Sequence, residues 1–345
     1  MSVKGQRFFM RFIYPLLAAL LACGTDDVEI SGTLQGPSVL VTNGGDNSIS
    51  VIDPETMQER HRLFITAPHN TFLHHIGVSP DGQRFALAFP TYDFSGGHDG
   101  LHGLESKGYV VVYNRFTERN EMTVQVPFAN HNAVFSPDGT EIWTGLVSHS
   151  GRLLVLDSQN GNLIKEIVVG PDPHEVIFAG GYVLVTCLES SFLTVIDPVT
   201  KSLVRDIKVD PFPSNVWPGK EPHQVIVENS NQKSLNFVDL QRLQVTDHVD
   251  LPFAPGFSAF SPERDLWICA KGQDFLYVYE KNNGTWEMKA RIATQRDPHY
   301  VMFLKEQVWL VNQKQNTVEI FDRKTHTKIA EIATGLKPNA IVYIP

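Results

Sequence analysis

Cysteine and charge are both scarce in this sequence. Its 345 residues include 3 cysteines, too few for a disulfide framework that would hold a fold together. Charged residues make up only 19%, whereas a disordered chain or a coiled coil would carry more charge, so we exclude both classes. With 42% hydrophobic residues, the chain can bury a sizeable core in one large domain or two ordinary ones.

Basic residues are few as well, and the formal net charge is −9 at pH 7. The first 22 residues hold Lys4, Arg7 and Arg11 and no acidic residue, so the remainder carries −12. This balance disfavours nucleic acid, or an anionic membrane surface, as the main partner. Signature motifs of several enzyme classes are also missing, because no GxSxG, HExxH, P-loop or GxGxxG sequence stands out.

The N-terminus has no hydrophobic run long enough to span a bilayer. Spanning takes about 20 residues, and the apolar run at residues 12–22 has 11. A basic segment followed by an apolar run and small residues is typical of a secretory signal. The run ends in Leu20-Leu21-Ala22-Cys23-Gly24, which resembles the bacterial lipobox, whose cysteine is lipidated and becomes the new N-terminus.

We therefore expect a lipoprotein signal peptide over residues 1–22 and a lipid anchor on Cys23, followed by a polar tether that ends at residue 37. An ordinary signal peptide cleaved nearby is the alternative. By resemblance to the sorting rule of enteric bacteria, Gly24 after the cysteine favours the outer membrane. The expected location is the bacterial periplasm, with the membrane as a partner through the lipid.

One unit is repeated through the rest of the chain. The unit consists of an apolar strand, a polar turn and a second strand that ends on an acidic residue or asparagine. It recurs at residues 40–54, 184–198 and 309–322, with weaker copies at 143–157, 226–239 and 267–280 and a stretched copy at 85–114. Ser-Pro-Asp-Gly sequences at 79–82 and 136–139 lie between copies, where proline and glycine favour tight turns. Each unit therefore contains four short strands, which is the signature of a propeller blade of about 40 residues.

The unit occurs seven times. Aligning the strand after each linker gives equivalent positions at His74, His131, His174, Ser214, Gly256, His299 and Asn339. The sequence enters the first unit at its second strand, near residues 39–42, and ends with an orphan first strand at 340–344. We predict an all-β, seven-bladed β-propeller over residues 38–345, with four-stranded blades, closed by pairing of the N- and C-terminal strands in one blade.

These repeats resemble the YVTN family of seven-bladed propellers, which includes periplasmic YncE-like proteins, over about nine-tenths of the chain. The resemblance implies the fold and says little about function, because such propellers serve as enzymes, cofactor binders and scaffolds. It also implies that ligands bind on one face, formed by the linkers into the innermost strands and the loops between second and third strands.

Histidine is concentrated on that face. Of the 13 histidines, 9 map to it by alignment: His69, His74, His75, His98, His102, His131, His149, His174 and His299. A spacing of 57 residues between the first two aligned positions marks an insertion in blade 2, residues 91–108, which carries His98 and His102. The candidate metal- or cofactor-binding residues are His74, His131, His174, His299, His98, His102 and His149.

Imidazole is the commonest protein ligand for copper, zinc and iron. We therefore expect copper, zinc or a haem-type iron over blades 2–4 and 7. The alternative for the aligned histidines is a structural role, because histidines at this point of the family's repeat commonly bind neighbouring backbone. The alternative for His98 and His102 is a solvated glycine-rich loop.

Two known propellers are similar in architecture and face. Nitrous oxide reductase carries a copper cluster on a histidine ring, and haem d1 proteins hold a tetrapyrrole on an eight-bladed propeller. This chain has seven units, no CxxCH motif and no cupredoxin domain, so the residues of neither family are carried over.

Two other residue types share repeat positions. Cys187 and Cys269 are equivalent in blades 4 and 6, too far apart for a mutual disulfide, and are predicted to be small buried residues. For Cys187, a copper ligand beside His174 is the alternative. Trp143, Trp267 and Trp309 are predicted to pack between blades.

The sequence thus predicts a lipid-anchored propeller facing the periplasm that binds a metal ion or metallocofactor, or a partner that carries one. Besides the membrane, the expected partner is a periplasmic protein or a small ligand. A metal-free interaction scaffold is one alternative. A propeller enzyme, either a lactonase-like hydrolase or a copper oxidoreductase, is the other, and the sequence identifies no catalytic residue.

Overall fold

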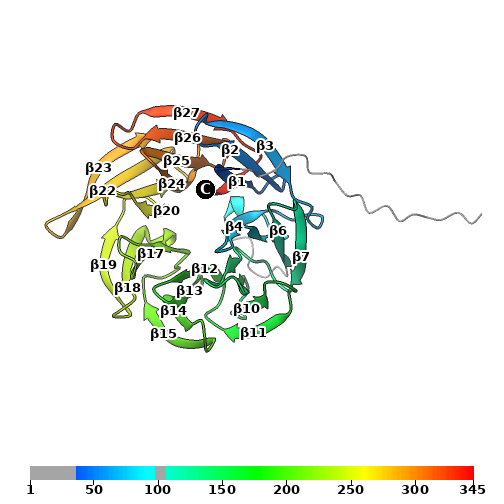
Figure 1. Cartoon of the computed structure of the whole chain (residues 1–345). Helices are drawn as coiled ribbons and strands as arrows, with labels where there is room; N and C mark the ends of the chain where they lie inside the picture. The colour runs from blue at the N-terminus through cyan, green and yellow to red at the C-terminus, as the bar shows by residue number, and fades with distance from the viewer. Residues whose placement is uncertain (1–35, 98–105) are drawn as a thin grey trace, which may run out of the picture.

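Each sequence repeat folds into a four-stranded antiparallel sheet, and seven such sheets form a ring around a central channel (Figure 1). The structure, a computed structural model, describes residues 36–97 and 106–345. The predicted seven-bladed β-propeller is confirmed. The expected signal peptide, Cys23, His98 and His102 lie outside the described residues. Within them, no helix has the length and apolar character needed to cross a membrane.

In the first four blades the strands follow one another from the channel outward in chain order, except that the C-terminal strand is innermost in blade 1. Blade 1 consists of β28 (Pro338–Ile344), β1 (Ser38–Asn43), β2 (Ser48–Asp53) and β3 (Gln58–Phe64). Blade 2 consists of β4 (His74–Val78), β5 (Arg84–Ala88), β6 (Gly108–Asn114) and β7 (Arg119–Val126). Blade 3 consists of β8 (Val134–Phe135), β9 (Glu141–Leu146), β10 (Arg152–Asp157) and β11 (Leu163–Val168). Blade 4 consists of β12 (Pro173–Ala179), β13 (Tyr182–Cys187), β14 (Phe192–Asp197) and β15 (Ser202–Lys208).

The remaining blades follow the same order. Blade 5 consists of β16 (Asn215–Pro218), β17 (Gln224–Asn229), β18 (Ser234–Asp239) and β19 (Gln244–Asp250). Blade 6 consists of β20 (Pro255–Phe260), β21 (Leu266–Ala270), β22 (Phe275–Asn282) and β23 (Thr285–Ala293). Blade 7 consists of β24 (Pro298–Leu304), β25 (Gln307–Asn312), β26 (Thr317–Asp322) and β27 (Lys328–Ala333). The 3₁₀ helices η1 (Phe94–Gly96) and η3 (Ser230–Gln232) lie in second-to-third strand loops.

Blade 1 is built from both ends of the chain, as predicted. Strand β28 pairs antiparallel with β1, with Ser38 opposite Ile344 and Thr42 opposite Ala340. The pairing gives β1 a partner on its channel side and buries Ile341 and Ile344, which are 4% and 3% exposed. The ring therefore closes through backbone hydrogen bonds, and no blade is left with an open inner edge.

The core lies between neighbouring blades. Trp143, Trp267 and Trp309 are at most 1% exposed. The ring of Trp143 lies 5.7 Å from that of Phe178 in blade 4, and Trp267 makes an equivalent edge contact with Phe303 in blade 7. The predicted packing of these tryptophans between blades is confirmed.

The predicted Ser-Pro-Asp-Gly turns are also present. In the first, the N–H of Gly82 donates to the carbonyl oxygen of Ser79 at 2.8 Å, and Gly82 has a φ of 69°. Gly139 repeats this geometry with a φ of 74°. Glycine adopts this left-handed conformation without a Cβ clash, which explains its place in the turn.

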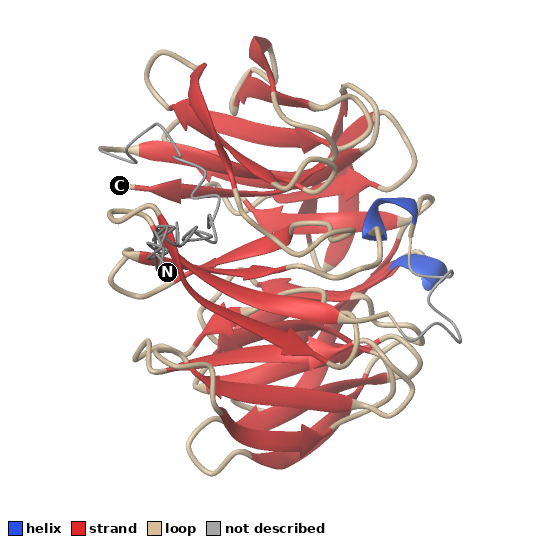
Figure 2. Ribbon diagram, turned by 90° about the vertical axis from the view of Figure 1, so that its right-hand side faces the viewer, coloured by secondary structure: helices blue, strands red, loops and turns tan. Residues whose placement is uncertain are grey.

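The propeller has two different faces (Figure 2). The C-terminus lies at one face, shown on the left, together with the start of β1, whose Ser38 pairs with Ile344. The short helices lie at the other face, on the right. We call these the terminal face and the histidine face, since the linkers carrying the aligned histidines enter their strands from the second one.

Candidate metal centre

The aligned positions lie at or just before the start of the innermost strands, on the histidine face. His74 and His131 line a cavity of about 170 Å³ there, together with His75 and His299. His174 is fully buried beside them, with its ring centroid 3.5 Å from that of His131. His74, His131, His174 and His299, which the sequence predicted to gather near blades 2–4 and 7, thus lie close together at the channel mouth.

A β-bulge brings one more imidazole into this cavity. The register between β4 and β5 shifts between His74 and Ile76, and His75 has a φ of 56°. A bulge re-aims a side chain, so two successive residues both face the channel. The rings of His74 and His75 stack with centroids 4.5 Å apart. Residues other than glycine adopt this left-handed conformation less often, and at His75 it accompanies the bulge.

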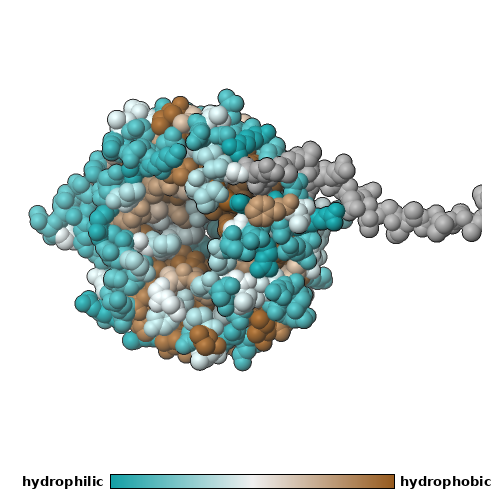
Figure 3. All heavy atoms as spheres, viewed as in Figure 1, coloured by the Kyte–Doolittle hydropathy of each residue, from teal (hydrophilic) through white to brown (hydrophobic). Residues whose placement is uncertain are grey.

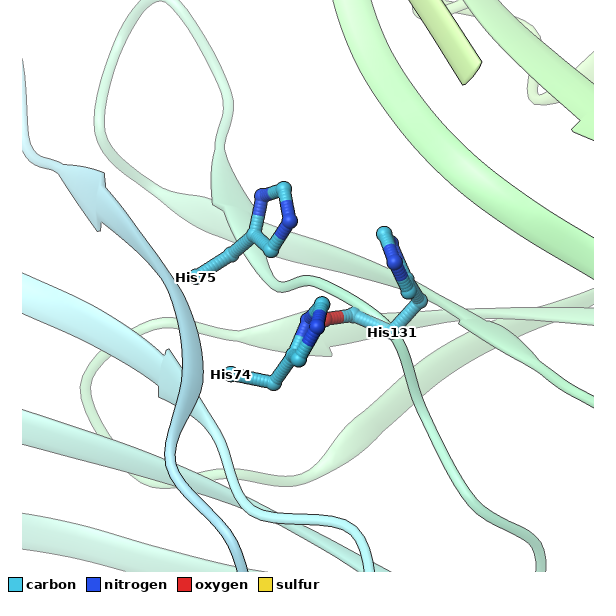
Figure 4. A group of neighbouring side chains, drawn as sticks. All are labelled: His74, His75 and His131. Atoms are coloured by element: carbon cyan, nitrogen blue, oxygen red, sulfur yellow. The ribbon is translucent and has the colours of Figure 1, made fainter. Parts of the chain in front are cut away.

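Three imidazoles from two blades face one another (Figure 4). One ring nitrogen from each of His74, His75 and His131 lies within 4.8 Å of the others. The ring centroid of His131 is 4.3 Å from that of His74 and 4.6 Å from that of His75. We call these three residues the histidine cluster.

Hydrogen bonds to backbone fix how these rings are turned. Nδ1 of His74 lies 3.0 Å from the carbonyl oxygen of His131, and Nδ1 of His174 lies 2.6 Å from that of Ser214. Because a carbonyl oxygen only accepts, Nδ1 carries the hydrogen in both rings. Metal-ligating histidines are typically oriented by such a bond, which leaves the lone pair on Nε2. The backbone role that sequence offered as an alternative is real, and it is compatible with metal binding.

Buried polar groups support His131. Its Nδ1 lies 3.0 Å from Oε2 of Glu175, and the side-chain amide of Asn132 donates to Oε1 of the same carboxyl at 2.6 Å. Glu175 is 3% exposed, and burial raises the pKa of its carboxyl well above the usual range. This bond fixes the ring of His131, and when its Nδ1 donates to the carboxylate form of Glu175, the lone pair lies on Nε2, as in carboxylate–histidine–metal arrangements.

The described part of the insertion in blade 2 covers the aligned histidines. Asp93 caps η1 through the N–H of Ser95, and its carboxylate forms an ion pair with Lys337 beside β28. Phe94 is thereby held with its ring 5.2 Å from that of His74 and 5.4 Å from that of His131, in edge contacts. An apolar ring over the imidazoles limits the access of water.

Burial keeps the imidazoles of this cavity neutral. It lowers the pKa of His74 and of His174 to about 3, and that of His299 to about 4. The pKa of His75 also falls well below its usual range, first through burial and then through repulsion from the neighbouring histidines. A neutral imidazole is the form that binds metals.

These pKa values lead to an expected loss of stability in acid. Below about pH 6.5 the unfolded chain protonates its histidines while the folded cavity does not, so the free energy of unfolding falls as pH falls. Each such histidine contributes about 1.4 kcal/mol per pH unit. Glu175 has the opposite effect on the pH dependence and offsets the contribution of one histidine, because its raised pKa lets the folded state hold a proton that the unfolded state has lost.

The measurement is urea unfolding of metal-free protein between pH 7 and pH 5. His174→Gln removes one titrating group and keeps a side-chain donor near the carbonyl oxygen of Ser214. We expect a shallower dependence of stability on pH in this variant, by about 1.4 kcal/mol per pH unit at most. Equal slopes in the two proteins would show that His174 is not held neutral.

Among the described residues, the other candidate ligands His149, His174 and His299 do not belong to the histidine cluster. The side chain of His149 is 60% exposed, and its Nδ1 lies 2.5 Å from Oε2 of Glu189, which raises the pKa of the imidazole. Together with Asp172 these two residues form a separate group of potential ligands. His69 is exposed.

The cysteines are core residues of the propeller. Cys187 and Cys269 are fully buried and form no disulfide. Burial raises the pKa of the Cys187 thiol to about 12, which disfavours the thiolate that a copper ligand would need. None of the ligand groups found in residues 36–97 and 106–345 includes Cys187, which argues against the copper-ligand alternative.

The sequence placed His75 on the histidine face but not among the candidate ligands. It did not predict that Glu175 contacts His131 or that Phe94 packs against the imidazoles. The His74-His75 pair was the available signal, since two adjacent residues reach one side of a strand only at a bulge. Nothing in the sequence pattern pointed to Glu175, which acts from the neighbouring blade.

The fold and this geometry define a class: a seven-bladed β-propeller with a largely buried histidine cluster at one mouth of its channel. No family model and no curated protein matches the sequence, and membership of the YVTN family remains a prediction. The periplasmic gluconolactonase PpgL of Pseudomonas aeruginosa is similar in structure, with a TM-score of 0.68 and 14% identity over 90% of this chain and 99% of that one.

Two haem- or nitrogen-related proteins are similar as well. Dihydro-haem d1 dehydrogenase NirN, in complex with DHE, has a TM-score of 0.60 and 14% identity over 88% of this chain and 74% of that one. Hydrazine synthase of Kuenenia stuttgartiensis has a TM-score of 0.62 and 17% identity over 81% of this chain and 98% of that one. At these identities the likeness establishes the fold alone.

Proposed function

We propose that this propeller binds a transition-metal ion, zinc or copper, through His74, His75 and His131. The observation that supports it is the convergence of one nitrogen from each ring within 4.8 Å. Ligands of a tetrahedral zinc stand roughly 3.3 Å apart, given bonds of 2.0–2.1 Å. Metal binding would therefore shorten the distances between the three ring nitrogens by about 1.5 Å or less, and rotation of the side chains can supply such a shift.

The surroundings favour a transition metal over calcium or magnesium. The cluster offers imidazole nitrogen, which suits zinc and copper, whereas the hard cations prefer sets of oxygen ligands. Burial keeps the rings neutral, so a metal does not compete with protons at neutral pH. His174 lies next to His131 and offers a fourth imidazole.

The test is metal binding by the purified propeller, residues 24–345, without a histidine tag. After dialysis against chelator, it is offered zinc or copper, and the bound metal is measured by elemental analysis. We expect one equivalent that survives gel filtration. Failure to retain either metal at micromolar concentration would rule out the proposal and leave a metal-free scaffold.

We also propose that the chain is exported to the periplasm and held at the outer membrane by a lipid on Cys23. The lipobox-like sequence supports this, as does a structural neighbour whose name places it in the periplasm. In cells fed radiolabelled palmitate, we expect the wild type to be labelled in the membrane fraction. Cys23→Ser should lose the label and the membrane association, and a variant that stays labelled would contradict lipidation at this residue.

A further inference from the structure

The channel has a second cavity that differs in chemistry from the histidine mouth. It has a volume of about 370 Å³, within the range of small-molecule sites. Its lining comes from the middle and far ends of innermost strands, so it opens toward the terminal face. Figure 3 shows that face, with the channel hollowed at the centre and apolar side chains around it.

Aromatic side chains form one wall of this cavity. The rings of Phe257 and Tyr300 stack with centroids 3.7 Å apart, and that of Trp217 lies 4.4 Å from Phe257. These three residues and His75 line both cavities, so they stand between the two ends of the channel. A ligand entering from the terminal face would therefore meet a flat aromatic surface at the inner end.

The opposite wall is aliphatic, with Ile76, Val134 and Ile177. Among the described residues, the lining contains no lysine, arginine or aspartate, and its one glutamate is Glu175, whose carboxyl is already bonded to His131 and Asn132. A charged ligand would lose its hydration here without gaining a counter-ion. The cavity thus selects for neutral molecules.

One polar group in the wall lacks a partner. The indole Nε1 of Trp217 is buried and has no hydrogen-bond partner among the described residues. Native proteins rarely leave such a donor unpaired. A ligand oxygen reaching the edge of this indole would satisfy it after a small movement of the ring.

From these observations we infer that the terminal-face cavity is a binding site for a small neutral aromatic molecule bearing a hydroxyl or carbonyl oxygen. The aromatic wall would stack against the ligand ring, the aliphatic wall would cover its other face, and the oxygen would pair with Trp217. This site shares His75 with the histidine cluster but opens from the other end of the channel, and the proposal does not require a bound metal.

The test compares two probes of the same ring system. We expect 2-naphthol to bind with a stoichiometry of one in isothermal titration calorimetry, and naphthalene-2-sulfonate to bind at least about tenfold more weakly, because its charge cannot be compensated. Absence of 2-naphthol binding at millimolar concentration, or equal affinity for the two probes, would overturn the inference.

Substitutions locate the binding. Ala259 lines this cavity and not the other one, so Ala259→Trp should fill it and weaken 2-naphthol binding at least about tenfold, while Ala259→Ser should not. Ile177→Trp fills the cavity from the opposite wall and serves if the first variant does not fold, as judged by circular dichroism. Undiminished binding in a folded tryptophan variant would place the ligand elsewhere and refute the assignment.

Discussion

A chain that ends at Lys337 is expected to lose the cooperative unfolding transition of the full propeller. The truncation removes β28, which supplies the innermost strand of blade 1. Burial of side chains such as Ile341 and Ile344 contributes about 1.5–3 kcal/mol each, and each backbone hydrogen bond to β1 about 0.5–1.5 kcal/mol. Together these approach the total stability of a typical domain, about 5–15 kcal/mol.

The effect should exceed the contacts of one strand, because the ring opens as well. Without β28, the inner edge of β1 is unpaired and blade 1 loses its place between blades 7 and 2. Thermal unfolding followed by circular dichroism measures the outcome. Removal of the exposed Pro345 alone is the matched control and should change little, whereas Ile341→Ala should cost about 2–5 kcal/mol. A cooperative, near-native transition in the Lys337 truncation would mean that ring closure is dispensable.

Loss of metal binding in the double variant His74→Ala/His131→Ala is the second large effect we expect. It removes two of the three proposed ligands, one of which, His74, is oriented by the carbonyl oxygen of His131. Removal of a single supporting group behind a ligand typically costs 10–100-fold in metal affinity. Loss of two ligands should therefore reduce zinc or copper affinity by at least about 1000-fold in a chelator competition assay.

The control is His149→Ala, which removes an exposed histidine of the same face outside the cluster. It should bind one equivalent with unchanged affinity. Circular dichroism must show the double variant folded, and His75→Asn provides a milder change because asparagine tolerates positive φ. If the His149 variant lost the metal and the double variant kept it, the site would lie at the group formed with Glu189 and Asp172.

The repeat made most of the fold predictable. Blade number, ring closure and the tight turns depend on local patterns that recur at a regular spacing, such as Ser79 to Gly82 and its copy at Ser136 to Gly139. Alignment also gave the height of each histidine along the channel, because equivalent residues occupy equivalent places in every blade.

The centre itself was less predictable, because alignment does not give the distance from the channel axis. His149 shares the face of His131 but faces solvent beside Glu189. His75 depends on a bulge and a positive φ, and Glu175 contacts His131 across a blade boundary. Such contacts arise from how neighbouring blades meet, which a pattern within one repeat does not encode.

The placement of the chain ends gives the molecule an orientation. Strand β1 begins at Ser38 on the terminal face, the face to which the aromatic cavity opens. The histidine mouth opens on the opposite face. If the lipid anchor that we propose held the terminal face against a bilayer, an apolar solute dissolved in the lipid would reach one end of the channel by a short path, while a hydrated metal ion would reach the other end from bulk water.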